Sequence, residues 1–396
     1  MIDELENTIQ PYAWGSYTAI SSLRGEGAAA SPQAELWMGA HPLAPSRLAR
    51  TGETLLHAIA ERPAECLGEA VLARHGAKLP FLLKVLAAET PLSLQAHPSA
   101  AQAIEGFAAD EAARIPLTSP LRNYKDKSHK PELLCALTEF WALCGFRDPA
   151  ETQALLDDLA LPELAQLRAL LERGPRPIAI KSAFSSLMLS PKSERRELSL
   201  RVAEACAERA AGSRFSAELG WAARLGELYP GDAGVVSALL LNLLRLEPGQ
   251  AVYLPAGNLH AYLGGMGVEI MASSDNVLRG GLTSKHVNVT ELLRILDFTP
   301  LAVSPIHPLL VEGEARYAAP AREFALSYFD VADGERLVDV AGPEIWLVTS
   351  GTVELESEGR SLTLSGGRSA FVEAQSGRLA LRGAGRIYRA SVPYSA

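Results

Sequence analysis

The sequence has few cysteines, no long apolar run and no cluster of basic residues, and each absence excludes a class of protein. Its four cysteines include no CxxC pair, and the chain has 396 residues. Thiols scattered in a chain of this size predict a reduced, cytoplasmic protein and not a disulfide-stapled secreted one. The most apolar stretch, at 235–246, is interrupted by Asn242 and Arg245. It is too short for a membrane-spanning helix, which needs about 20 mostly apolar residues.

Positive charge is also scarce. The chain carries 37 Lys and Arg against 46 Asp and Glu, a formal net charge of −9. Nucleic-acid binding depends on neutralising phosphates, so this composition argues against a nucleic-acid partner. The first ten residues, MIDELENTIQ, lack a basic region and an apolar region, and we expect no signal peptide. With 48% hydrophobic residues the chain has ample material for a core, as expected of a folded enzyme or small-molecule binder.

The apolar pattern divides the chain into three parts. Residues 1–148 and 235–300 hold strand-length apolar runs such as FLLKVL and PELLCAL, with one short helix expected near 290–297. Residues 149–234 have leucines at helical spacing and two starts with proline in the first turn, which predicts an insert of four to six helices. Residues 301–396 show short alternating segments about ten residues apart, typical of a separate β-sandwich or barrel.

The segment GQAVYLPAGNLHAYL at 249–263 is the most informative. Gly249, Pro255, Gly257 and His260 have the G-x5-P-x-G-x2-H spacing, which resembles the second metal motif of the cupin barrels. Glycine and proline shape a tight turn between strands, and the histidine then opens the next strand with its ring toward the barrel interior. A structural histidine after a Pro/Gly turn is the alternative interpretation.

Two further segments offer matching ligands. In PLSLQAHP, Ser93, Gln95 and His97 alternate, so in a strand they point to one face. In SHKPELL, Lys130 and Glu132 also share a face, whereas His129 points the other way. Two imidazoles, a carboxylate and an amide oxygen suit Zn²⁺ with one coordination position left open, as catalytic zinc sites require. A satisfied polar cluster at a barrel mouth is the alternative.

The segment VEIMASSDNVLRGGLTSK at 268–285 places a carboxylate before two cations in an acidic protein. Arg279 and Lys285 suit a phosphate group, and Glu269 suits proton transfer. Surface ion pairs, or a turn cap in the case of Asp275, are the alternatives. The GGMG run at 264–267 lacks the pattern of a phosphate loop and indicates a turn.

Five segments together resemble type I mannose-6-phosphate isomerases: IQPYAWGS, AELWMGAHP, LPFLLKVLAAETPLSLQAHPS, HKPELLCALTEFWALCGFR, and YLPAGNLHAYL with GVEIMASSDNVLRGGLTSKHV. They cover most of residues 5–300, while the helical insert and the tail match weakly. The resemblance implies a mainly β fold of cupin (jelly-roll type) barrels with an α-helical insert. A zinc-bearing cupin catalytic domain would span 1–148 plus 235–300, a helical insert domain 149–234, and a C-terminal cupin-like β domain 301–396. In the C-terminal domain, the segment around Gly367 lacks the proline and the histidine of the cupin metal motif, so this domain would hold no metal.

The resemblance also assigns residues and partners. It implies one Zn²⁺ per chain, a catalytic role for Arg279, and a pocket for a small-molecule sugar phosphate. The implied zinc ligands are Gln95, His97, Glu132 and His260, and the implied pocket residues are Lys130, Glu269, Lys285, Ser93, Trp14, Tyr262 and Asp275. Ser128, Met266 and Ser284 depart from the usual family residues, which affects fine specificity and leaves every implied ligand in place.

The implied reaction is interconversion of mannose 6-phosphate and fructose 6-phosphate through a cis-enediol(ate), with zinc as Lewis acid and template, as part of carbohydrate metabolism and GDP-mannose biosynthesis. Arg279 either stabilises the enediolate or binds phosphate. Glu269 is either the base or orients a water, and Lys130 and Lys285 are either phosphate ligands or proton carriers. An iron-dependent oxygenase and a non-catalytic sugar-phosphate binder are the rival functions. We expect a cytoplasmic monomer.

Overall fold

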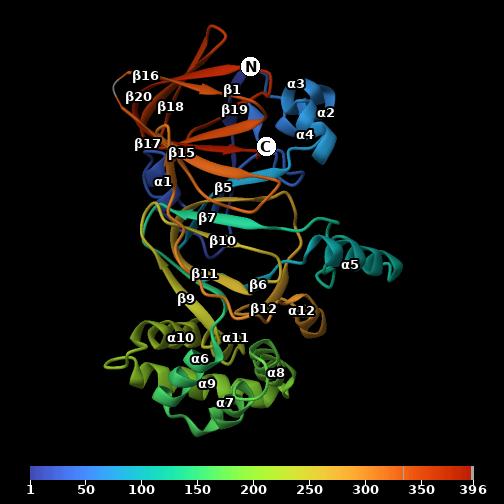
Figure 1. Cartoon of the computed structure of the whole chain (residues 1–396), viewed down its shortest axis with the longest axis vertical. Helices are drawn as coiled ribbons and strands as arrows, with labels where there is room; N and C mark the ends of the chain where they lie inside the picture. Colours follow the sequence, from blue (N-terminus) through green and yellow to red (C-terminus); the bar gives the residue numbers. More distant parts are fainter. Residues whose placement is uncertain (333, 394–396) are drawn as a thin grey trace.

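The computed structural model describes residues 1–332 and 334–393. The last three residues of the expected C-terminal domain, and residue 333 within it, lie outside this part. The molecule is elongated, with three parts stacked along its long axis (Figure 1). A β-sheet part that holds the chain start and the last described strand lies at one end, a second sheet lies in the middle, and a group of helices forms the other end.

The middle part is a ten-stranded antiparallel sheet. Its longest strand, β11, pairs through its first residues with β6 and β8, and through its remaining residues with β5 and β7. The strands are β2 (Thr8–Gln10), β3 (Glu35–Met38), β5 (Phe81–Ala88), β6 (Leu94–Ala96), β7 (Glu132–Ala136), β8 (Phe140–Phe146), β9 (Leu241–Leu246), β10 (Ala251–Leu254), β11 (His260–Ala272) and β12 (Leu278–Gly281).

Strand β11 bends where the two sets of partners meet. The register shifts between Tyr262 and Gly264, and Gly265 has φ +117°, a conformation that L side chains rarely adopt. A Cβ at Gly265 would lie 2.4 Å from the Glu139 carbonyl oxygen, so the position accepts only glycine. The GGMG run is thus a bend within a strand, and not the separate turn that the sequence predicted.

Six short helices flank the sheets: α1 (Ala19–Leu23), α2 (Leu55–Glu61), α3 (Pro63–Leu67), α4 (Glu69–His75), α5 (Ala100–Ala112) and α12 (Val289–Ile295). The sequence predicted only the last of them. Four of the other five have seven residues or fewer, which is too short for a helical repeat to stand out. Helix α5 was readable, because Ser99 and Gln102 form a capping box at its start.

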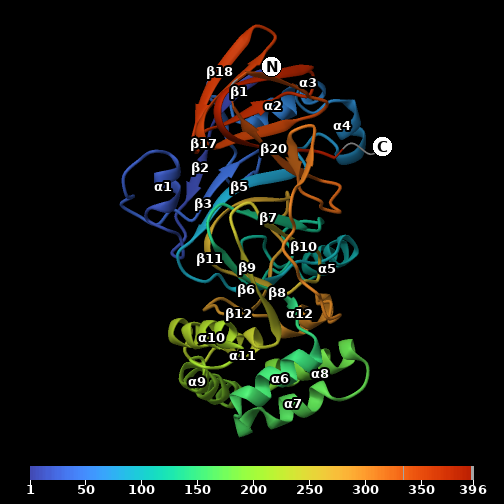
Figure 2. The same cartoon turned by 60° about the vertical axis from the view of Figure 1, so that its left-hand side comes forward.

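Helices occupy the far end of the molecule (Figure 2). They are α6 (Pro149–Leu159), the 3-10 helix η1 (Pro162–Leu164), α7 (Ala165–Leu171), α8 (Arg176–Leu189), α9 (Lys192–Arg209), α10 (Ser216–Leu228) and α11 (Gly234–Ala238). Asp148 caps the first of them by accepting from the Ala150 N–H. Buried side chains such as Phe184 and Leu225 belong to one core that continues to Leu259 and Ala261 of the middle sheet.

The second ten-stranded sheet contains the C-terminal strands and two strands from the chain start. These are β1 (Ile2–Glu6), β4 (Arg47–Leu48), β13 (Leu309–Val311), β14 (Glu314–Arg316), β15 (Ala325–Val331), β16 (Glu335–Asp339), β17 (Glu344–Ser357), β18 (Arg360–Ser365), β19 (Ser369–Val372) and β20 (Arg378–Ser391). Residues 301–396, expected to form a β module of their own, therefore share this sheet with the chain start, because β1 pairs with β19. Ile2 and Leu5 bury their side chains in the cores on this sheet.

Two expectations about the chain as a whole can be compared with the fold. All four cysteines are buried and free, as expected for reduced thiols. Within the described residues, every helix is too short or too polar to cross a lipid bilayer.

Candidate metal centre and substrate pocket

Three of the four predicted metal ligands come together in the middle sheet. His97 follows the end of β6, Glu132 begins β7 and His260 begins β11. The Nε2 atoms of the two histidines lie 3.4 and 3.3 Å from the two carboxylate oxygens of Glu132. One ligand atom from each residue lies within 4.8 Å of the others, and all three side chains are buried.

The buried polar atoms of this cluster lack hydrogen bonds. His97 Nε2, His260 Nε2 and Glu132 Oε2 have no hydrogen-bond partner. Leaving such atoms unsatisfied in a protein interior costs free energy, and a bound cation removes that cost. Three nitrogen and oxygen atoms of the kinds that zinc prefers as ligands therefore converge on one point without a partner. This arrangement fits a divalent, zinc-like ion.

Backbone carbonyls hold both imidazoles in the orientation that a metal requires. His97 Nδ1 lies 2.7 Å from the Asn276 carbonyl oxygen, and His260 Nδ1 lies 3.0 Å from that of Asn258. A carbonyl only accepts, so each Nδ1 carries the hydrogen and each Nε2 offers a lone pair to the cluster. Burial lowers the pKa of His97 to about 4, which keeps this imidazole neutral near pH 7.

Glu132 stays ionised inside the protein. Burial opposes its ionisation, but the Lys130 ammonium 3.0 Å away holds the pKa of Glu132 well below its usual range. Lys130 and Glu132 do share a face, as the sequence predicted. His129 points away, and its Nε2 lies 2.7 Å from the Glu323 carboxylate outside the cluster.

Strand register brings the fourth predicted ligand and the predicted catalytic arginine to the same place. On β6, Gln95 lies opposite His260 of β11 and opposite Arg279 of β12. Directly paired residues of neighbouring strands have their side chains on the same face. The register therefore places Gln95, His260 and Arg279 in one row. Only Leu94–Ala96 is a strand here, so His97 joins the cluster from the loop that follows β6.

The turn before His260 fits the motif from which it was predicted. Gly257 has φ +76°, and a Cβ there would lie 3.1 Å from the Asp297 nitrogen and the Ile295 carbonyl oxygen. The Gly257 N–H donates to the His97 carbonyl oxygen at 2.8 Å. This turn therefore connects the backbones of the two histidine segments.

A second polar group lies on the other half of β11. Glu269 is buried, accepts a hydrogen bond from the Tyr262 hydroxyl at 2.9 Å, and lies 3.4 Å from the Lys84 ammonium of β5. Burial raises the pKa of Glu269, and the carboxylate charges of Glu132 and Glu35 add to the shift. A carboxyl group in these surroundings is suited to taking and returning a proton.

Lys84 and Glu35 were missed in the sequence. Lys84 Nζ lies between Glu35 (3.5 Å) and Glu269, and its charge is also above the Trp37 ring at 5.2 Å. Burial by itself would lower the pKa of Lys84, but the two carboxylates outweigh it and raise that pKa. The signal was a lysine within the otherwise apolar run FLLKVLAA, since a buried lysine requires a partner.

Asp275 has a buried partner that was also missed. His41 Nε2 lies 3.3 Å from Asp275 Oδ1, and the Leu43 N–H points to His41 Nδ1 at 3.3 Å. Nδ1 is therefore the acceptor and Nε2 the donor toward Asp275. Burial would raise the pKa of Asp275, but the His41 hydrogen bond and the charges of Lys130 and Lys84 lower it.

The two predicted phosphate-binding cations remain without acidic partners. Among the residues that the structure describes, no carboxylate forms an ion pair with Arg279 or Lys285. The charge of Arg279 contributes to a lowered pKa of Lys285, after the larger effect of burial. Burial likewise lowers the pKa of Arg279. Two neighbouring, unneutralised cations are suited to an anionic ligand.

The remaining predicted pocket residues differ in how they lie. Trp14 packs with Tyr262 in one apolar cluster, and its ring centroid is 5.8 Å from that of Tyr12. Ser93 is partly buried, two residues before Gln95 on the segment that leads into β6. Both thus border the elements that carry the cluster.

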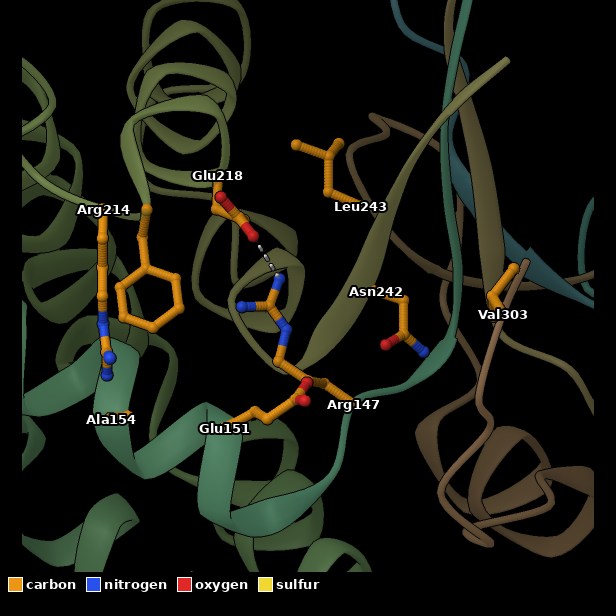
Figure 3. A pocket seen from close by; sticks show the side chains of 9 residues that line it. Arg147, Glu151, Ala154, Arg214, Glu218, Asn242, Leu243 and Val303 are labelled. Carbon is orange, nitrogen blue, oxygen red and sulfur yellow. Dashed lines mark ion pairs between the residues drawn. The ribbon is translucent and has the colours of Figure 1, made fainter. Parts of the chain in front are cut away.

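A separate cavity of about 430 Å³ lies between the helices and β9 (Figure 3). Arginine and glutamate side chains line it together, and Arg147 and Glu218 form an ion pair of 3.4 Å within the lining. It contains none of the predicted site residues. Its lining is Arg147, Glu151, Ala154, Arg214, Phe215, Glu218, Asn242, Leu243 and Val303.

Comparison with known proteins identifies relatives along the whole chain. Residues 2–149 match the family model "Phosphomannose isomerase type I, catalytic domain". The mannose-6-phosphate isomerase of Escherichia coli (strain K12) is 37% identical over 394 residues, which cover 98% of this chain and 99% of that protein. The mannose-6-phosphate isomerase 1 of Arabidopsis thaliana is 32% identical and covers 98% of this chain and 93% of its own length.

Solved structures of such enzymes have the same fold. A mannose 6-phosphate isomerase bound with zinc and yttrium has a TM-score of 0.91 and 36% identity, and covers 99% of this chain and 100% of its own. Variants of the Salmonella typhimurium phosphomannose isomerase have also been solved, with substitutions at a histidine, two lysines and a glutamate. The substituted residues follow one another at the same spacing as Lys84, His97, Lys130 and Glu132.

Proposed function

The chain belongs to the type I phosphomannose isomerase family, and we propose that it interconverts mannose 6-phosphate and fructose 6-phosphate at a single zinc site. The observation that supports this proposal best is the juxtaposition of two features. Three buried, unsatisfied donors converge at His97, Glu132 and His260, and Gln95 of the same row lies beside Arg279, a cation without an acidic partner.

Zinc would be held by Gln95, His97, Glu132 and His260. When bound, it supplies a Lewis acid that polarises the sugar carbonyl and a template for the two reacting oxygens. The aldose and the ketose differ only in whether the carbonyl is at C1 or C2. Their interconversion requires a proton to leave the carbon next to the carbonyl, giving a cis-enediol(ate), and to return at the neighbouring carbon.

We assign the proton transfer to Glu269. Its carboxyl group is buried, and Tyr262 and Lys84 orient it from two sides. Burial raises its pKa, so this carboxyl is a stronger base than an exposed one. Lys84 also pairs with Glu35, so Lys84, Glu35 and Glu269 together carry one net negative charge. That charge favours uptake of the proton by Glu269.

The two free cations have separate roles in the proposal. Arg279 lies opposite Gln95 in the strand ladder, and its assigned role is to stabilise the negative charge of the enediolate. Lys285 lies six residues further along and binds the phosphate of the substrate, which fixes the sugar relative to Glu269. Lys130 keeps Glu132 ionised through their 3.0 Å contact.

Turnover of mannose 6-phosphate in D₂O, followed by NMR, tests the function. We expect fructose 6-phosphate from the zinc-loaded protein, no product after chelation, and recovery on adding zinc. Deuterium at the transferred position supports the enediol route. Tight binding of mannose 6-phosphate without product would identify a sugar-phosphate binder instead, and oxygen uptake with iron would identify an oxygenase.

We propose further that the enzyme is a cytoplasmic monomer with one zinc per chain, in which residues 1–148 and 235–300, apart from β1 and β4, form the catalytic cupin domain. Four buried free thiols fit a reducing compartment, and one cluster of ligands among the described residues fits a single zinc. Native mass spectrometry of the loaded protein gives the zinc content per chain and the oligomeric state together. Two zinc ions per chain, or a stable dimer, would contradict the proposal.

A further inference from the structure

A buried hydrogen-bond network links the metal cluster to the loop that carries Asp275. This loop joins β11 to β12, and Asn276, which it contains, is fully buried. The Asn276 carbonyl oxygen accepts from His97 Nδ1 at 2.7 Å. The position of the loop backbone therefore decides where the acceptor for this metal-site imidazole lies.

One carboxylate holds this loop in place. Asp126, in the segment between α5 and β7, accepts from the Asp275 N–H at 2.8 Å and faces the Ser274 hydroxyl at 2.9 Å. It also accepts from the Asn276 side-chain amide at 3.2 Å and from the Ser128 N–H at 2.8 Å. Four donors on one carboxylate make a strong and geometrically defined anchor.

Asn276 completes the network from the other side. Its Oδ1 accepts from the backbone N–H groups of Lys125 at 2.7 Å and Asp126 at 3.2 Å. Its Nδ2 donates to the carbonyl oxygens of Asp126 and Ser128, both at 2.9 Å. The side chain thus uses its donor and its acceptor on the segment 125–128, while its backbone holds His97.

We propose that Asp126 is a positioning residue that fixes the metal ligand His97 and the pocket residue Asp275 through one loop. The inference rests on the proposed function. Asp126 touches neither group's reacting atoms. It acts through the Asn276 carbonyl, which orients His97, and through the Asp275 N–H, which fixes the backbone from which the Asp275 carboxylate reaches His41. Partners that orient a metal-bound histidine commonly change metal affinity when they are removed.

The test is Asp126→Asn, which keeps the size of the side chain and replaces one acceptor oxygen by an NH₂ group. Zinc affinity of the full chain is measured by competition with a chromophoric chelator, without reference to activity. We expect the Kd for zinc to rise about tenfold to a hundredfold. At saturating zinc we expect kcat/KM for mannose 6-phosphate to fall by at least about tenfold, because misplaced pocket groups slow the reaction.

The control is Asp148→Ala. Asp148 also accepts a backbone N–H, as the cap of α6 at the start of the helical insert. Losing this cap should lower the melting temperature and leave the zinc Kd within twofold of the unsubstituted value. Ser274→Ala removes a single donor to Asp126 and serves as a milder variant if Asp126→Asn does not fold. Ser274→Ala should also raise the zinc Kd, by a smaller factor than Asp126→Asn.

A lowered melting temperature with an unchanged zinc Kd, in Asp126→Asn or in Ser274→Ala, would overturn the proposal and leave Asp126 as a loop stabiliser only. The affinity measurement separates this result from failure of the proposed function. If the unsubstituted protein binds zinc without isomerase turnover, a higher zinc Kd in Asp126→Asn still supports the role of Asp126 toward His97.

Discussion

Lys84 of β5 lies directly opposite Glu269 of β11, and the ammonium and carboxylate are 3.4 Å apart in the interior of the protein. On its other side the same ammonium lies 3.5 Å from Glu35. One cation is thus shared by two buried carboxylates, of which only Glu269 also accepts from the Tyr262 hydroxyl. The Tyr262 hydrogen bond therefore distinguishes Glu269, the proposed proton carrier, from Glu35.

Glu269→Gln keeps the shape of the side chain and removes the proton acceptor. We expect kcat to fall about 10²–10⁴-fold, the usual contribution of a positioned acid or base, with a small change in KM. Steady-state kinetics with mannose 6-phosphate measure it. Glu35→Gln is the matched control, since it also removes one carboxylate from Lys84. An equal loss in both variants would mean that charge on Lys84, and not proton transfer by Glu269, limits the reaction.

Arg279→Ala removes the cation beside Gln95. We expect kcat/KM to fall roughly 100–1000-fold, because a fixed group that stabilises developing negative charge contributes about 3–4 kcal/mol. Arg279→Lys should recover part of the loss, as the charge remains and the planar fork does not. Zinc content should be unchanged in both variants. A loss of zinc, as measured by mass spectrometry, would show that Arg279 supports the metal site instead.

Lys285→Met tests phosphate recognition. A hydrogen bond to a charged group contributes about 1.5–3 kcal/mol, so KM for mannose 6-phosphate should rise about tenfold to a hundredfold. Inhibition by inorganic phosphate should weaken by a similar factor. Lys181→Met, on α8, is a control lysine outside the site. If kcat falls while KM and phosphate inhibition stay constant, Lys285 carries protons and does not bind phosphate.

Zinc should stabilise the metal-free protein against heat, since it satisfies His97, Glu132 and His260 only in the folded state. At a free zinc concentration of 100 times Kd the gain is about 2.7 kcal/mol. Glu132→Gln should abolish most of this rise in melting temperature, as followed by circular dichroism. The surface variant Glu139→Gln should keep it. An unchanged rise in Glu132→Gln would place the stabilising zinc at another site.

Leu5→Ala tests whether the chain start belongs to the C-terminal sheet. Leu5 is 2% exposed on β1, and its removal should lower the free energy of unfolding by about 2–5 kcal/mol. Leu309→Ala, at a leucine that is 69% exposed on β13, should change it by less than about 0.5 kcal/mol. Urea titration compares the two. Equal effects would mean that β1 is not part of the packed core.

Sequence patterns located the parts of the site that are close together in the chain. The alternation of Gln95 and His97, the shared face of Lys130 and Glu132, and the Pro/Gly turn before His260 each rely on a few neighbouring residues. Their local geometry follows from the two-residue repeat of a strand and from turn stereochemistry. The structure brings His97, Glu132 and His260 together as these patterns predicted.

The sequence by itself determined the residue types that suit a metal and an anion, and the strand and turn segments that carry them. Only the tertiary structure decided that Lys84 pairs with Glu269, that His41 meets Asp275, and that β1 joins β19. These contacts join residues from 185 to 370 positions apart, which the folding of whole sheets brings together. The physical reason is that long-range register depends on the packing of whole sheets, which no local repeat encodes.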